Sequence, residues 1–236
     1  MARPSRASWL AQAALVAGKD LRIEGRSREV LYTMAFLAAL VVLVFSFAFI
    51  SEQEVSIGPD AVAGILWVAV LFSGTVALSR TFDRERESEA IRSLLLSPAA
   101  RSAIYAGKLA ATTAIMFLVE WLLLPLMAVL FSARIAPHAL WLALLLLLGN
   151  VGFSSVGVIF SAALLRARSR DALLSALLFP IVIPVLLAAS RATAYLLDPT
   201  AASLDPALFW TRFLGALDVI FVVVGLWSFE PVVLGE

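Results

Sequence analysis

Six long apolar runs, separated by short polar segments, dominate this chain and restrict what it can fold into. The runs cover about Val30–Ile50, Ala61–Ser79, Leu109–Ser132, Ala139–Leu165, Ala172–Ser190 and Phe213–Phe229. A helix of about 20 apolar residues crosses the roughly 30 Å of hydrocarbon in a bilayer. Of the 236 residues, 62% are hydrophobic and 15% are charged, whereas soluble domains are about half apolar and about a quarter charged. The sequence therefore predicts an all-α integral membrane protein, with six transmembrane helices in one membrane domain over 30–236.

The basic residues are distributed unevenly between the two sides of this predicted bundle. If the chain alternates sides at each span, 15 of the 18 Lys and Arg residues lie on one side and 3 on the other. Loops that remain in the cytoplasm carry an excess of Lys and Arg. We therefore expect both termini to be cytoplasmic, together with the segment between the second and third spans, where six basic residues lie within 80–108.

The first 29 residues differ in pattern from the spans. Basic and acidic residues alternate there with apolar residues at near-helical spacing, including Trp9, Leu10, Ala13, Val16 and Leu21. This periodicity predicts a cytosolic amphipathic helix along the membrane surface.

Several kinds of chemistry are excluded by residues that the chain lacks. It has no cysteine and one histidine, His138, so it contains no disulfide, thiolate metal site or multi-histidine metal centre. It also lacks a GxxxxGK[ST] phosphate-binding loop, because Gly18–Lys19 and Gly107–Lys108 have neither the upstream glycine nor the following hydroxyl. We expect a subunit that is not an enzyme, with no metal, and no nucleic acid as partner.

The loop after the second span predicts a short cytosolic helix. Acidic residues begin it, where they favour the helix dipole, and an apolar stripe follows; Ser97–Pro98 then predicts the start of the next helix. The candidate docking residues are Phe82, Asp83, Arg84, Glu85, Arg86, Glu87, Ile91, Leu94, Leu95, Leu96, Ser97 and Pro98. The same pattern is consistent with an interfacial helix that only places its charges at the lipid headgroups.

Polar residues inside the apolar runs are the other candidates. Glu120, Asn150 and Asp218 lie within the third, fourth and sixth spans, and intramembrane carboxylates are costly enough to indicate function. They are equally consistent with a role in helix packing. Small residues in the fourth span, such as Gly149 and Gly152, predict close helix approach.

Two further features concern the fifth span and the loop before the fourth. Pro180 and Pro184 lie four residues apart and predict a kink, which is either a hinge or a static bend. His138 is expected at the outer end of the fourth span. An imidazole there could ligate haem iron or could simply be solvated.

Two stretches of the chain resemble one transporter family. The run GILWVAVLFSGTVALSRTFDRERESEAIRSLLLSP (64–98), followed by AGK (106–108), is similar to the haem exporter protein B (CcmB) family. The run LLGNVGFSSVGVIFSAALLRARSRDALLSALLFPIVIPVLLAAS (147–190) resembles the fourth and fifth helices of the same family. Together the stretches cover most of residues 63–190.

The resemblance implies a permease of the ABC-2 exporter type, with an N-terminal elbow helix, a coupling helix between spans two and three, and homodimeric assembly. It implies a bacterial inner-membrane location and a role in c-type cytochrome biogenesis. Expected partners are a separate ATPase subunit, haem-handling membrane subunits and a periplasmic haem chaperone. ATP would act through the ATPase, and haem would be handled by the complex without a cofactor site in this chain.

Two alternatives stay open at this point. The first is an ABC-2 permease for another cargo, such as a drug, a lipid or a polysaccharide. The second is a proton-coupled carrier or intramembrane enzyme built around Glu120 and Asp218. The sequence leaves undecided whether haem itself crosses this subunit and which helices form a dimer interface.

Overall fold

The computed structural model describes residues 8–49, 57–82, 100–133, 135–167, 169–198, 200 and 203–234, and these are helical with no strand among them. The seven long helices are α1 (Trp9–Ser27), α2 (Glu29–Phe49), α3 (Pro59–Arg80), α6 (Arg101–Phe131), α7 (Ala139–Ala163), α8 (Arg170–Leu197) and α9 (Asp205–Leu234). Two short 3-10 helices, η1 (Ala136–His138) and η2 (Leu164–Arg166), flank α7. Six of these helices, α2 to α9, are long and apolar enough to cross a membrane. The predicted multi-pass helical membrane protein is confirmed.

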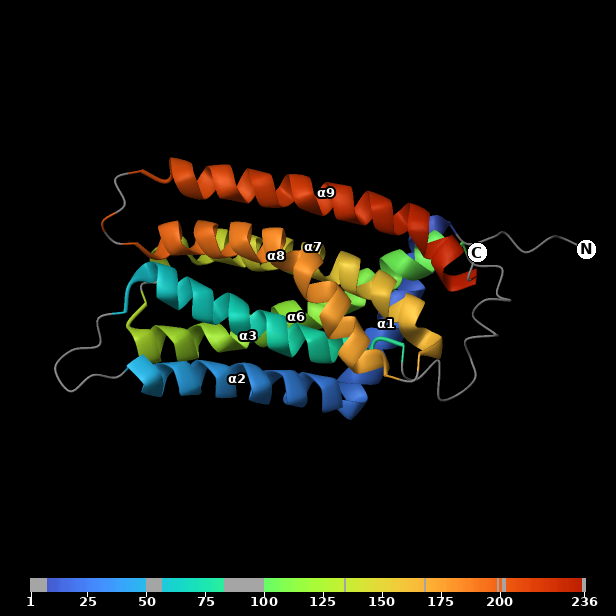
Figure 1. Ribbon diagram of the computed structural model, residues 1–236, viewed down its shortest axis with the longest axis horizontal. Helices are drawn as coiled ribbons and strands as arrows, with labels where there is room; N and C mark the ends of the chain where they lie inside the picture. Colours follow the sequence, from blue (N-terminus) through green and yellow to red (C-terminus); the bar gives the residue numbers. More distant parts are fainter. Residues whose placement is uncertain are drawn as a thin grey trace, which may run out of the picture.

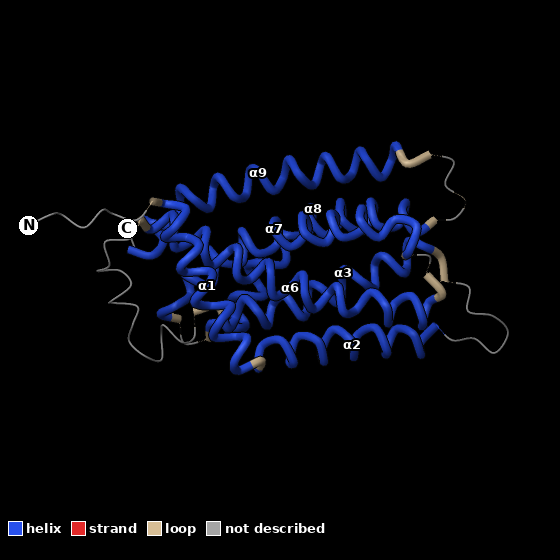
Figure 2. Tube along the Cα trace, turned by 180° about the vertical axis from the view of Figure 1, so that it is seen from behind, coloured by secondary structure: helices blue, strands red, loops and turns tan. Residues whose placement is uncertain are grey.

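The six long apolar helices run side by side, and α1 lies across one end of the bundle (Figure 1). The same end contains the end of α3, the start of α6, the turn from α7 to α8 and the end of α9, as the view from behind also shows (Figure 2). The segments that the sequence predicts to be cytoplasmic therefore share one end of the molecule.

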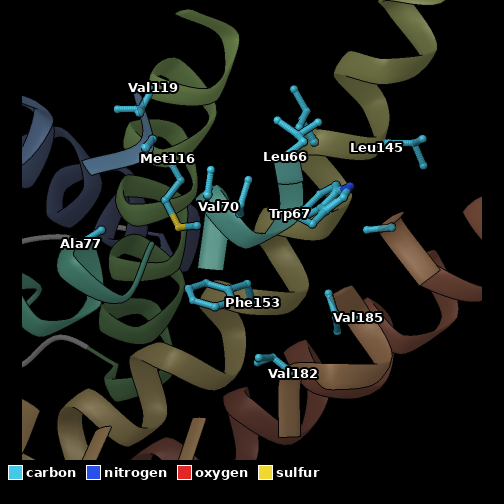
Figure 3. Packing of buried hydrophobic residues seen from close by; sticks show 14 of the residues in the cluster. Leu66, Trp67, Val70, Ala77, Met116, Val119, Leu145, Phe153, Val182 and Val185 are labelled. Atoms are coloured by element: carbon cyan, nitrogen blue, oxygen red, sulfur yellow. The ribbon is translucent and has the colours of Figure 1, made fainter. Parts of the chain in front are cut away.

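The interior of the bundle is formed mainly by α3 and α7. Of the apolar window of α7, 67% is buried, compared with 17% for α9. Trp67 of α3 lies against α7 at Gly149, where a Cβ atom would stand 2.2 Å from the indole ring. Met116 of α6 and Phe153 of α7 meet beside α3 in the same layer (Figure 3). The prediction of close helix approach at the small residues of the fourth span is confirmed.

The junction between α1 and α2 is very short. Arg28 adopts a left-handed conformation (φ 55°) and donates its amide to the Glu24 carbonyl at 2.7 Å. The buried Glu24 side chain then accepts the amide of Leu31 at 2.9 Å, so it caps the first turn of α2. One polar side chain thus fixes the angle at which the first span leaves α1.

Several helices extend beyond the predicted spans. Helix α6 begins at Arg101, eight residues before the apolar run that starts at Leu109. Residues 191–212, between the last two apolar runs, are mostly helical, because α8 continues to Leu197 and α9 begins at Asp205. Pro206 lies in the first turn of α9, where a backbone N–H is not required. Hydropathy detects only the part of a helix that is apolar.

Candidate functional site

The predicted docking residues lie almost entirely outside the described part of the chain. Only Phe82 of that set is described; the residues from Asp83 to Pro98 are not, which includes Ser97–Pro98 as a helix start. The structure does describe both places where the segment 83–99 joins the bundle. We call residues 78–82 the α3 junction and residues 100–105 the α6 junction.

At the α3 junction, side chains from three other helices hold the last carbonyl groups of α3. Ser161 Oγ donates to the Leu78 carbonyl (2.8 Å), Arg170 Nη2 to the Ser79 carbonyl (2.5 Å) and Lys108 Nζ to the Thr81 carbonyl (2.7 Å). The last carbonyls of a helix lack intrahelical partners, and cations near them also favour the helix dipole. Helices α6, α7 and α8 therefore all fix the end of α3.

Phe82 is the aromatic anchor of this junction. Its side chain is buried and stacks with Phe229 of α9, with ring centroids 6.5 Å apart. The ammonium of Lys108 lies 4.8 Å from the Phe82 ring centroid, which is cation–π range. Tyr105 completes the cluster, 5.6 Å from Phe229, and donates its hydroxyl to the Ser155 carbonyl at 3.0 Å. Phe82 is placed to hold the junction in the bundle.

The α6 junction is held by α1. Ala100, which precedes α6, has no capping side chain of its own. Gln12 of α1 supplies the missing acceptor by receiving the Ala100 amide at 2.8 Å, and the Trp9 indole donates to the Ser102 hydroxyl at 2.9 Å. An amphipathic helix from the start of the chain thus caps the helix that follows the segment 83–99.

A buried ion pair joins α1 to α6 beside these contacts. Lys108 Nζ lies 3.0 Å from Asp20 Oδ2, and only 2% of the lysine side chain is exposed. Next to it, α1 crosses Gly107 so closely that a Cβ there would stand 2.7 Å from the Ala13 carbonyl oxygen. Sequence reasoning missed Lys108, Asp20 and Gln12. A lysine at the start of an apolar run indicates a buried cation that needs a partner. Nothing in the sequence identifies Asp20, far away in the chain, as that partner.

The polar candidates within the spans form two separate groups. Asn150 Nδ2 donates to Glu120 Oε2 at 2.6 Å, so these two form a buried α6–α7 pair, while Glu120 Oε1 and Asn150 Oδ1 have no hydrogen-bond partner among the described residues. Asp218 is buried on α9 against α7 at Gly152, where a Cβ would stand 2.5 Å from Asp218 Oδ1. Neither Asp218 oxygen has a partner in the described chain. Glu120 and Asp218 therefore do not form one carboxylate pair.

Comparison with known proteins identifies the family to which this geometry belongs. The profile of the family described as CcmB protein matches residues 11–233, from α1 through to the last turn of α9. The chain belongs to the CcmB family. It is similar to proteins named Heme exporter protein B. The Haemophilus influenzae protein is 30% identical over 73% of this chain and 76% of its own length. The Pseudomonas aeruginosa protein is 27% identical over 86% of this chain and 89% of its own length. The Rhodobacter capsulatus protein of the same name is 35% identical over 53% of this chain and 57% of its own length.

The CcmB match covers both junctions and all of α1 except its first two residues, so the contacts of Gln12 and Asp20 fall within the matched region, whereas Trp9 lies just before it. His138 ends η1 and is half-buried. Within the described ranges no three His, Cys, Asp or Glu residues gather as a metal site would. Haem ligation by the single His138 is not tested by this and stays a prediction. Helix α8 is continuous through Pro180 and Pro184, and the kink there likewise stays a prediction.

Proposed function

We propose that this chain is the permease subunit of an ABC transporter that handles haem during c-type cytochrome biogenesis. The observation that carries the proposal is the CcmB match along residues 11–233, together with three relatives named Heme exporter protein B. In this proposal a separate ATPase subunit binds the segment 83–99 from the cytoplasm. The chain works as a homodimer in the bacterial inner membrane, beside haem-handling membrane subunits and a periplasmic haem chaperone. Haem is the cargo of the complex, whether it crosses this subunit or leaves on its chaperone.

The geometry of the α3 junction supports a mechanical role. Lys108 and Arg170 connect the end of α3 to α6 and α8 by hydrogen bonds to the Thr81 and Ser79 carbonyls. The Thr81 and Ser79 carbonyls lie just before the segment 83–99, at the end of α3. A displacement of that segment would therefore move α3 and, through the two cations, α6 and α8. ATP-driven closure of the partner would then tilt α3, α6 and α8 together.

Deletion of the gene tests the cargo. Staining for covalently bound haem should show that c-type cytochromes are lost in the deletion strain and restored by the parent gene on a plasmid. Normal cytochrome levels in a strain with no second copy of the gene would contradict the maturation role and favour an ABC-2 permease for another cargo.

Charge reversal tests the docking segment. The double variant Arg84→Glu and Arg86→Glu should reduce the amount of ATPase subunit that copurifies with the membrane chain. Arg212→Glu is the control, because Arg212 is exposed near the start of α9, and α9 begins at the end of the bundle opposite α1 (Figure 1). Equal recovery of the ATPase from both variants would refute docking at this segment.

One substitution separates the permease from a proton-coupled mechanism. Glu120→Gln keeps an oxygen that can accept from Asn150 Nδ2 but cannot exchange a proton. Cytochrome maturation should persist in this variant. Its loss, with normal amounts of folded protein, would instead favour the carrier or intramembrane enzyme built on Glu120 and Asp218.

A further inference from the structure

We propose that Lys108 is a positioning residue that ties the α3 junction to α1, so that α1 and the two junctions respond as one unit when a partner docks. The inference rests on the proposed function only in giving the segment a partner. It concerns a helix, α1, that lies outside the six spans and outside the predicted docking residues.

Lys108 joins three elements through one buried group. Its ammonium donates to the Thr81 carbonyl at the end of α3 and pairs with Asp20 of α1, while its own backbone belongs to α6. A buried ammonium is stable only when it is paired and hydrogen-bonded. Asp20 and the Thr81 carbonyl therefore need to stay together around Lys108, and α1 cannot separate from the α3 junction without breaking one of these contacts.

The other end of the segment is attached to the same helix. Gln12 accepts the Ala100 amide and Trp9 donates to Ser102, so α1 contacts the α6 junction directly. Both junctions are thus bound to α1, the α3 junction through Lys108 and Asp20 and the α6 junction through Gln12 and Trp9. Helix α1 packs along α6 much more extensively than on α2, so its position depends mainly on α6.

Lys108 differs in this respect from the other groups at the α3 junction. Ser161 and Arg170 hold carbonyls of α3 from α7 and α8, and these two hydrogen bonds do not involve α1. The neighbouring Lys19 also pairs with Asp20, at 3.1 Å, but 46% of its side chain is exposed and it lies on α1 itself. Lys19 therefore serves as a matched control with the same partner and charge.

The test uses hydrogen exchange on the purified full-length chain, without any partner. Lys108→Met should accelerate amide exchange by roughly tenfold in peptides from α1 and from residues 100–105, while peptides from the centre of α7 keep the parent rate. Lys108→Arg, which can still donate to both Thr81 and Asp20, should restore parent rates. Lys19→Met should also keep them.

The second readout is recovery of the ATPase subunit with the membrane chain. It should fall by about tenfold for Lys108→Met and return for Lys108→Arg. Unchanged exchange in α1 and the α6 junction for Lys108→Met would overturn the inference. Acceleration that extended equally through α7 would also overturn it, because Lys108 would then support the whole fold.

The two proposals fail in different ways. If the parent chain recovers no ATPase, the proposed function fails, while the exchange data still decide whether Lys108 ties α1 to both junctions. If the parent recovers the ATPase and Lys108→Met recovers it equally, the docking function stands and the coupling through α1 is refuted.

Discussion

Buried ionisable side chains occur in two regions of this protein, and their surroundings differ. At the α3 junction the buried Lys108 has a carboxylate, a carbonyl and an aromatic ring around its ammonium. Near the middle of α9 the buried Asp218 has no partner for either oxygen among the described residues. Burying an ion without partners is far more costly than burying a partnered one. The first group holds three helices together, whereas no hydrogen bond from the described residues stabilises the second.

The largest expected effect comes from separating α1 from α6. Gly107→Ala would place a Cβ 2.6 Å from Val16 Cβ and 2.7 Å from the Ala13 carbonyl oxygen. Because the obstacle includes backbone, α1 would have to shift, and overpacking of this kind costs about 1–3 kcal/mol. Thermal unfolding followed through the fluorescence of the six tryptophans should show the loss of stability.

Gly18→Ala is the control for that variant. Gly18 is also helical, on α1, but nothing lies within 4 Å of a Cβ built there. Alanine should leave stability unchanged or raise it by up to about 1 kcal/mol through helix propensity. Equal destabilisation by both variants would mean that the close α1–α6 contact is not what Gly107 protects.

The buried pair Glu120–Asn150 is intermediate between the two regions. Asn150→Leu removes the donor that reaches Glu120 at 2.6 Å and should destabilise the protein by about 1–3 kcal/mol, because a buried carboxyl loses its partner. The double variant Glu120→Met with Asn150→Leu removes both polar groups and should return close to parent stability. Unfolding of the four members of this cycle is the measurement. A double variant as unstable as the sum of the single variants would show that the two residues do not act as a pair.

The fold was far more predictable than these contacts. Apolar runs long enough to span a bilayer are visible in the sequence, so the six helices α2 to α9 could be predicted from transfer free energy alone. The full lengths of the helices are not visible in hydropathy, because polar helical turns at Arg101 and Asp205 extend past the apolar windows. The pairing of Lys108 with Asp20 depends on how α1 and α6 are rotated about their axes. A single sequence does not show which faces of two helices far apart in the chain meet.

Asp218 tests the opposite case, the removal of a buried carboxyl that has no hydrogen-bond partner among the described residues. Asp218→Asn has nearly the same shape and removes no hydrogen bond that the described structure contains, so stability should stay within about 1 kcal/mol of the parent, with any change in the stabilising direction. The measurement is again thermal unfolding of the purified chain. A clear loss of stability would show that Asp218 has a partner outside the described residues or on a second chain, which would make α9 a candidate interface.

The smallest effect is expected at the exposed pair between α6 and α9. Arg101 Nη1 lies 2.6 Å from Glu230 Oε1, with 28% and 57% of the two side chains exposed. Solvent screens such a pair, so Glu230→Gln should cost less than about 1 kcal/mol in unfolding, and less still at high salt. This distance is shorter than the 3.0 Å of the Lys108–Asp20 pair, yet the expected cost is smaller because burial, not separation, decides how much a broken ion pair loses. If Glu230→Gln destabilised the chain as strongly as Lys108→Met, the distinction between partnered burial and surface pairing would not hold for this protein.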